Sequence, residues 1–98
     1  MNLDEYSWTV SDWVKEKLAE RGISLGEVEE AVYNSIPPYL IETRKEHKTR
    51  PETRWFISQT ANERLLKVAF ILYEEQRLAV IKTAYEPEDY EVVNYGEY

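Results

Sequence analysis

The sequence lacks several residue types that common active sites require, and these absences narrow the functions open to it. There is no cysteine among the 98 residues, and His47 is the single histidine. A disulfide framework, a thiolate zinc site and a zinc site built from several histidines are therefore excluded, and we expect neither a metal nor another cofactor. The three glycines, at positions 22, 26 and 96, form neither a dinucleotide-binding fingerprint nor a phosphate-binding P-loop.

Long apolar runs are also missing. No stretch approaches the roughly 18 apolar residues of a membrane span, and the opening residues MNLDEYS contain two acids instead of the apolar segment of a signal peptide. We therefore expect no membrane association and a cytoplasmic location. A composition of 43% hydrophobic and 13% aromatic residues is typical of one folded domain, expected to cover residues 1–98.

Helical periodicity is present in the first third of the chain. Apolar residues recur on one face over residues 9–21, which predicts an amphipathic helix that ends at Gly22. Ser24 and Glu27 have the spacing of a capping box and predict the start of a second helix over residues 25–34. The double proline that follows prevents the helix from continuing.

The rest of the chain has the pattern of strands. We expect antiparallel strands at residues 39–43, 54–60, 65–73 and 78–85, with Lys67 the only polar residue of the third. A further short strand fits residues 6–9. The predicted fold class is therefore α+β, with two N-terminal helices packed on a mainly antiparallel four-stranded sheet and a short C-terminal helix.

Three finer expectations follow from the same patterns. The C-terminal helix is expected to begin near Pro87 and to direct Tyr90 and Val93 inward. Neither turn between the last three strands contains glycine; Asn62 tolerates a left-handed conformation, and the turn type stays open. Four aromatic residues lie on periodic faces and are expected in the core: Trp13, Trp55, Phe56 and Phe70.

Charge is distributed unevenly along the chain, which has a formal net charge of −7. Residues 1–43 contain nine acids and three bases, residues 44–54 two acids and five bases, and residues 55–98 eight acids and four bases. The middle segment, RKEHKTRPETR, thus has a net charge of +3 within an acidic chain. The bases that could bind an RNA phosphate there are Arg44, Lys45, Lys48, Arg50 and Arg54.

On charge alone, a solvated loop is the simpler interpretation of this segment, because nucleic-acid-binding domains are usually basic. His47 is a candidate general acid or base, since its basic neighbours disfavour its charged form; an exposed histidine without a function is the alternative. The acidic flanks favour binding to a basic protein partner, a function that would require no active site.

Three segments resemble the BrnT-like toxins of type II toxin–antitoxin systems. They are KLAERGISLGEVEEAVYN, HKTRPETRWFISQTANERLLKVAFILY and RLAVIKTAYEPEDYEVVNY, which together cover nearly the whole chain. Toxins of this kind are small ribonucleases with a RelE-like fold that act without a metal ion. The resemblance therefore implies a RelE-like fold, endoribonuclease activity and a small antitoxin protein as partner.

The resemblance also implies roles for individual residues. Arg54 matches the arginine that leads a strand, and with Lys48 and Arg50 it would neutralise the scissile phosphate. His47 matches the histidine before that strand, and His47 or Tyr85 would transfer the proton. Tyr85 stands where the family usually has an arginine at the end of the last strand.

Two functions of different class remain open. The first is a metal-independent ribonuclease toxin that acts on RNA through the basic segment, with a small antitoxin as its partner. The alternative is a catalytically silent protein-interaction module with an acidic surface. The sequence does not determine the RNA target or the oligomeric state.

Overall fold

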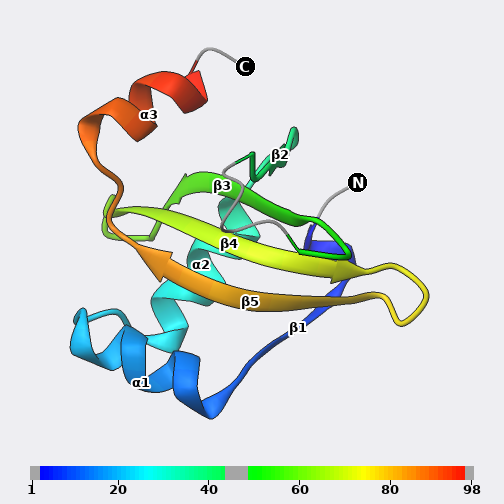
Figure 1. Cartoon of the computed structure of the whole chain (residues 1–98). Helices are drawn as coiled ribbons and strands as arrows, with labels where there is room; N and C mark the ends of the chain where they lie inside the picture. The colour runs from blue at the N-terminus through cyan, green and yellow to red at the C-terminus, as the bar shows by residue number, and fades with distance from the viewer. Residues whose placement is uncertain (1–2, 44–48, 97–98) are drawn as a thin grey trace.

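The computed structural model of the chain describes residues 3–43 and 49–96 (Figure 1). Its elements in chain order are η1 (Leu3–Glu5), β1 (Ser7–Val10), α1 (Asp12–Glu20), α2 (Leu25–Asn34), β2 (Leu40–Ile41), β3 (Thr53–Gln59), β4 (Leu65–Tyr73), β5 (Leu78–Tyr85) and α3 (Asp89–Gly96). The strands of these residues form one five-stranded sheet in the order β1-β5-β4-β3-β2. β1 is parallel to β5, and the other neighbours are antiparallel. The predicted α+β fold is confirmed, and the short N-terminal strand is part of its sheet.

Local side-chain chemistry sets the limits of the first two helices. α2 begins with the predicted capping box, in which Ser24 Oγ accepts from the backbone N–H of Glu27 and the Glu27 carboxylate accepts from the N–H of Ser24. α1 ends where Gly22 adopts a left-handed φ of 68°. The N–H of Ile23 then donates to the carbonyl of Leu18 at 2.9 Å, which closes the end of α1 and brings two buried apolar side chains together.

The two N-terminal helices cover one face of the sheet (Figure 1). α1 packs against β5, and α2 packs against β3 and β4. Phe56 and Phe70 are fully buried beneath them, and the ring of Tyr39 meets both at centroid distances of 5.6 Å with edge-on geometry. This side of the sheet therefore holds the aromatic core, and the opposite side is left to α3 and the loops.

Several finer expectations were wrong. Tyr90 and Val93 are 63% and 62% exposed, and α3 instead buries the acidic Glu91. Trp13 is 65% exposed, because the inward face of α1 is already occupied by Val14 and its apolar neighbours. The expectation that Phe56 and Phe70 lie in the core is confirmed.

The limits of three strands differ from expectation, with β1 and β3 each displaced by one residue from the predicted 6–9 and 54–60. β2 is limited to Leu40–Ile41, whereas β4 and β5 have the predicted limits. The turns, whose type the sequence left open, have their left-handed residues at Glu63 and Arg77, with φ of 65° and 49°. Turn geometry set by the paired strands thus outweighs the preference of the individual residues.

None of the helices in residues 3–43 and 49–96 has the length and apolar character needed to span a membrane.

Candidate functional site

The register of the central strands places a lysine on the face of the sheet away from α1 and α2. Lys67 of β4 pairs with Tyr85 of β5 on one side and with Ile57 of β3 on the other. Because side chains alternate along a strand, these residues project opposite to the buried Phe56 and Val68. Trp55 is two positions from Ile57 and lies on the same face as Lys67.

Lys67 is buried and forms an ion pair with α3. Its Nζ lies 2.6 Å from Oε2 of Glu91, and each of the two residues is only 6% exposed. The hydroxyl of Tyr85 donates to the same oxygen at 3.0 Å. Lys67 Nζ also lies 4.3 Å from the ring centroid of Trp55 and 5.7 Å from that of Tyr85. One carboxylate oxygen and two aromatic rings therefore surround the ammonium group.

The second oxygen of Glu91 stabilises the helix that carries it. Oε1 accepts from the backbone N–H of Glu88 at 2.9 Å. The carbonyl of Glu88 in turn accepts the first N–H groups of α3, from Glu91 and Val92. A glutamate that accepts from the N–H three residues before it is half of a capping box. Glu91 therefore both caps the start of α3 and attaches α3 to the sheet.

The ionisation of the cluster follows from these contacts. Burial is the largest single influence and disfavours both charged forms, but the hydrogen bonds and opposite charges around each group together outweigh it, so the pKa of Lys67 is raised and the pKa of Glu91 is lowered. Burial raises the pKa of Tyr85. Near neutral pH, Lys67 is a cation, Glu91 an anion and Tyr85 a protonated phenol. The cluster can thus donate hydrogen bonds and a proton, but Lys67 and Tyr85 are poorly suited to act as bases.

A groove of about 530 Å³ opens beside this cluster, between β2, β3 and α3. Trp55, Lys67, Glu91, Tyr90 and Asn94 are among the residues that line it. A hollow of this volume is in the usual range for small-molecule sites, and this one combines two aromatic rings with an amide and charged groups.

A second hollow of about 500 Å³ adjoins the groove. The two share Ile41, Glu42 and Thr43, and the second extends to Thr49 and Arg50. The two neighbouring hollows, together called the depression below, have lining residues from α3 to the beginning of β3. Residues 44–48 fall between Thr43 and Thr49 in the sequence, so the chain enters and leaves the basic segment at the second hollow.

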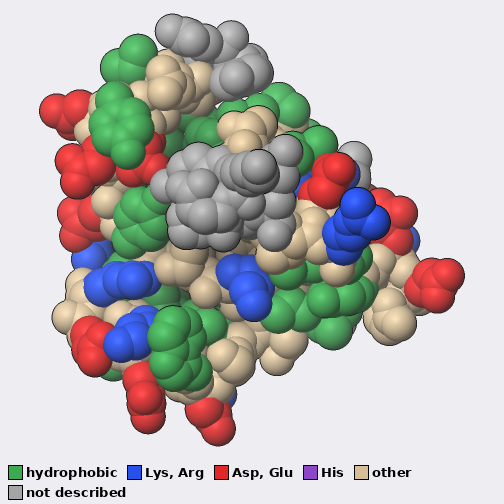
Figure 2. Space-filling view, viewed as in Figure 1, with side chains coloured by type: hydrophobic (Ala, Val, Ile, Leu, Met, Phe, Trp, Pro, Cys, Tyr) green, Lys and Arg blue, Asp and Glu red, His purple; other side chains and the backbone are tan. Residues whose placement is uncertain are grey.

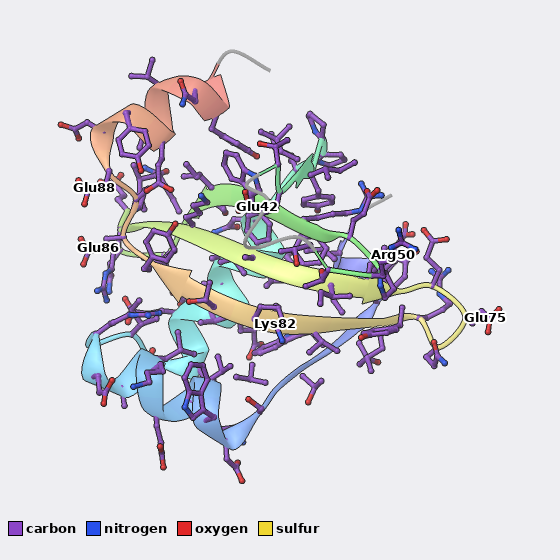
Figure 3. The ribbon with its side chains drawn as sticks, in the orientation of Figure 1. Glu42, Arg50, Glu75, Lys82, Glu86 and Glu88 are labelled. Atoms are coloured by element: carbon purple, nitrogen blue, oxygen red, sulfur yellow. The ribbon has the colours of Figure 1, made fainter. Side chains whose placement is uncertain are left out.

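Charges of both signs border this side of the molecule. Lys82 is the extra residue of β5 at the bulge opposite Ala69 and Phe70, and it projects from the sheet in Figure 3. Arg50 lies at the opposite end of the view from Glu86 and Glu88. Figure 2 shows basic side chains beside and below the grey residues and acidic side chains along the edge near α3. Acidic side chains therefore gather near α3, whereas the second hollow is lined by both signs, with Arg50 beside Glu42 and Glu52.

The structure describes three of the seven predicted site residues. His47, Arg44, Lys45 and Lys48 lie outside the described residues. Arg50 lines the second hollow, Arg54 is among the residues that line the groove, and Tyr85 borders the cluster through its bond to Glu91.

The sheet register separates two of these residues. Arg54 pairs with the buried Phe70, whereas Tyr85 pairs with Lys67. Alternation along the strands therefore directs Arg54 and Tyr85 toward opposite faces of the sheet. Arg54 is also among the residues that line a further hollow with Leu72 and Glu74. The proposed catalytic and phosphate-binding roles stay predictions.

Sequence reasoning did not identify Lys67 or Glu91 as members of a site. A signal for Lys67 was present, because a lysine within an otherwise apolar central strand needs a buried partner. There was no comparable signal for Glu91, one of eight acids in residues 55–98. Within the described ranges, no group of three or more histidine or acidic side chains is placed to hold a metal ion.

Comparison with known proteins identifies a family for most of the chain. Residues 10–86 match DUF4258, a domain of unknown function. No curated protein and no solved structure matches the chain. The matched residues run from the end of β1 to just beyond β5 and include Lys67, Tyr85 and Trp55, while α3 lies outside them. The family description names no activity, so the resemblance to BrnT-like toxins stays a prediction. Since the match covers more than half of its length, the chain belongs to the DUF4258 family of domains of unknown function.

Proposed function

We propose that this protein binds single-stranded RNA in the depression between α3 and the beginning of β3. The observation that carries the proposal is that two neighbouring hollows share three lining residues, with Trp55 and Tyr90 lining one hollow and Arg50 lining the other. Proteins bind single-stranded nucleic acid with a groove that combines cations for the phosphates and aromatic rings for the bases. This depression supplies both kinds of group.

The chemistry of the lining suits a nucleotide. Tyr90 is 63% exposed, so its ring is accessible to a base. Asn94 and Thr43 offer an amide and a hydroxyl that can hydrogen-bond with base edges or a ribose. Arg50 offers a guanidinium, which forms paired hydrogen bonds with phosphate oxygens.

The charge of the chain limits how such binding would work. With a net charge of −7, the body of the protein repels RNA at long range. Binding would therefore rest on a few local phosphate contacts, and each contact contributes about 0.7 to the slope of log affinity against log salt for a single strand. We expect affinity to fall steeply as salt increases from a low starting concentration.

Metal-independent cleavage of the bound RNA is the finer part of the proposal, and it rests on the resemblance to BrnT-like toxins. His47 would accept the proton of the ribose 2′-hydroxyl, and Arg54 would neutralise the charge on the phosphate. The register directs Tyr85 to the face of the sheet opposite Arg54, and its hydroxyl already donates to Glu91, so Tyr85 is given no role beside Arg54 at the same phosphate.

Binding is tested with fluorescein-labelled oligouridine, measured by anisotropy at several salt concentrations. The double variant Arg50→Ala/Arg54→Ala should bind at least ~5-fold more weakly, with a smaller salt slope, because it removes the two arginines that are among the residues lining the hollows. Lys15→Ala/Lys17→Ala is the matched control, since it removes the same charge from α1 on the other side of the sheet. Equal weakening in the two doubles, or no binding by the wild type at low salt, would refute the proposal.

Cleavage is tested separately with messenger RNA in EDTA. The wild type should cut the RNA without a divalent metal ion, and His47→Ala should abolish cutting while leaving the affinity for oligouridine nearly unchanged. If the wild type binds RNA but neither cuts it nor arrests growth when expressed, the ribonuclease part of the proposal fails and the binding part stands.

A second candidate function is a catalytically silent interaction module. The observation that favours it is the pairing of Lys67 with Glu91, which leaves no net charge at the centre of the sheet face. Such a module would bind a basic segment of a partner protein, for example a small antitoxin, through its acidic edge. Tight salt-sensitive binding of a basic peptide, with no binding of oligouridine, would favour this function over the first.

A further inference from the structure

The attachment of α3 to the sheet is mostly polar. Glu91 contacts Lys67 and Tyr85, and the ring of Tyr95 contacts that of Trp55 at a centroid distance of 5.6 Å. Of the other large apolar residues of the helix, Tyr90 and Val93 are mostly exposed and Val92 is half-buried. Helices of eight residues are marginal without tertiary contacts. The docking of α3 therefore depends mainly on the Glu91 carboxylate, with the ring of Tyr95 as a second attachment.

The surface under α3 has the chemistry of an anion site. Lys67 Nζ and the Tyr85 hydroxyl both donate to one oxygen of Glu91, at 2.6 and 3.0 Å. The Trp55 ring lies beside the ammonium group at 4.3 Å. A phosphate oxygen accepts the same two hydrogen bonds as a carboxylate oxygen, and an indole ring stacks with a base. These groups lie on the sheet, so they stay in place when the helix moves.

We propose that α3 is an autoinhibitory cover, and that the Glu91 carboxylate occupies a phosphate subsite formed by Lys67 and Tyr85, with Trp55 as the adjacent base-stacking surface. Undocking of α3 opens this subsite to a phosphate of single-stranded RNA. This inference rests on the proposed function for the identity of the ligand, but it uses residues different from Arg50 and Arg54. It therefore succeeds or fails by separate variants.

The burial of Lys67 is consistent with such a cover. A lysine in the middle of a sheet face is costly to bury without a partner, and an apolar residue of similar length would pack there without that cost. Glu91 supplies the partner only while α3 is docked. When α3 leaves, water and an incoming phosphate replace the carboxylate, so Lys67 is never left both buried and unpaired.

When a site is open in only a fraction of the molecules, its apparent affinity is the affinity of the open site multiplied by that fraction. Weakening the attachment of α3 should therefore tighten RNA binding. Replacing Glu91 by Gln removes the competing charge and keeps the shape of the side chain. Replacing Tyr95 by Ala removes the ring contact with Trp55 and leaves the ion pair intact. Two changes at different ends of the helix should thus act in the same direction.

The test measures oligouridine affinity of the full chain at low salt. E91Q should bind at least ~5-fold more tightly than E88Q, because only E91Q raises the open fraction. Glu88 is exposed and is the matched control, since its replacement removes the same charge from the same turn without touching the cluster. Y95A should show a gain as well. The gain should vanish in K67M/E91Q, which lacks the phosphate ligand.

Hydrogen exchange of the α3 amides supplies a second readout that a change of charge alone would not move. Exchange should be faster in E91Q and Y95A than in E88Q, with the amides of β4 unchanged. Equal affinities of E91Q and E88Q for oligouridine, or a gain in affinity that persists in K67M/E91Q, would refute the proposal that α3 is an autoinhibitory cover. If the wild type binds oligouridine through Arg50 and Arg54 and E91Q has no higher affinity, RNA binding in the depression stands and the autoinhibitory role of α3 is refuted.

If only E91Q and Y95A bind oligouridine, and they do so through Lys67, the autoinhibitory role of α3 stands and the role of Arg50 and Arg54 is refuted.

Discussion

Removal of the Glu91 carboxylate should cost more stability than removal of its partner ammonium group. The carboxylate accepts three hydrogen bonds, from Lys67, Tyr85 and the backbone of Glu88. In Glu91→Gln the charge is lost, and Lys67 is left without its counterion. In Lys67→Met the carboxylate keeps two donors, and the thioether chain fills the space of the lysine stem. Each substitution leaves one charge without its counterion, but Glu91 keeps two hydrogen-bond donors in K67M, whereas Lys67 loses its carboxylate acceptor in E91Q.

The magnitudes follow from the interactions that each substitution removes. Leaving a buried charge unpaired costs about 3–5 kcal/mol, and because undocking of α3 lets water reach Lys67, we expect a loss of about 2–3 kcal/mol for E91Q. For K67M one charge-assisted hydrogen bond is removed and apolar packing is improved, so we expect about 1 kcal/mol. For a domain of this length, each kcal/mol lowers the melting temperature by roughly 4–8 °C.

The assay is a double-mutant cycle by urea unfolding, followed by circular dichroism. The double variant K67M/E91Q should lose less stability than the two single losses combined, with an interaction energy of at least about 1 kcal/mol. E91Q should also have a smaller dependence on urea, since part of its surface is exposed before the sheet unfolds. An interaction energy below about 0.5 kcal/mol, or a larger loss in K67M than in E91Q, would refute this account of the cluster.

Three further predictions concern pH and the ends of the helices. The lowered pKa of Glu91 means that its stabilisation is present above the unfolded value of 4.5 and is lost as pH falls below it, so acid titration followed by circular dichroism should show less loss of stability in E91Q than in the wild type. Gly22→Ala should cost about 1–2 kcal/mol in urea unfolding, all of it from the left-handed φ of 68°, because no atom lies within 4 Å of the added methyl group; a loss well above this would indicate a clash. Ser24→Ala should cost about 1 kcal/mol, through loss of the capping box of α2, and an unchanged thermal midpoint would contradict that role.

Local pattern was sufficient for most of the architecture. The limits of α2, β4 and β5 were predicted to the residue, because a capping box and short polar turns are local chemical signals. Local pattern did not predict the exposure of Trp13, or that α3 buries Glu91 and exposes Tyr90 and Val93. The sequence of a short helix is compatible with burial of several of its faces. Which face is buried depends on what the sheet presents to the helix.

The candidate site was predicted less well than the fold. The concentration of bases in residues 44–54 is visible in the sequence, and Arg50 does line a hollow. The pairing of Lys67 with Glu91 spans 24 positions and joins a strand to a helix, and no spacing rule relates such residues. Arg54 and Tyr85 look equivalent as strand residues, yet the register directs them to opposite faces.

By itself, the sequence determined the class of fold, the order of its elements and the exclusion of thiolate chemistry, because these depend on periodicity, capping and composition within short stretches. Only the tertiary structure decided which acid meets the buried lysine, which face of the sheet α3 covers and which residues line the two neighbouring hollows. These features depend on strand register and on contacts between distant segments. A buried charge accepts a partner from any element that reaches it, so its partner is chosen by the fold and not by the neighbouring residues.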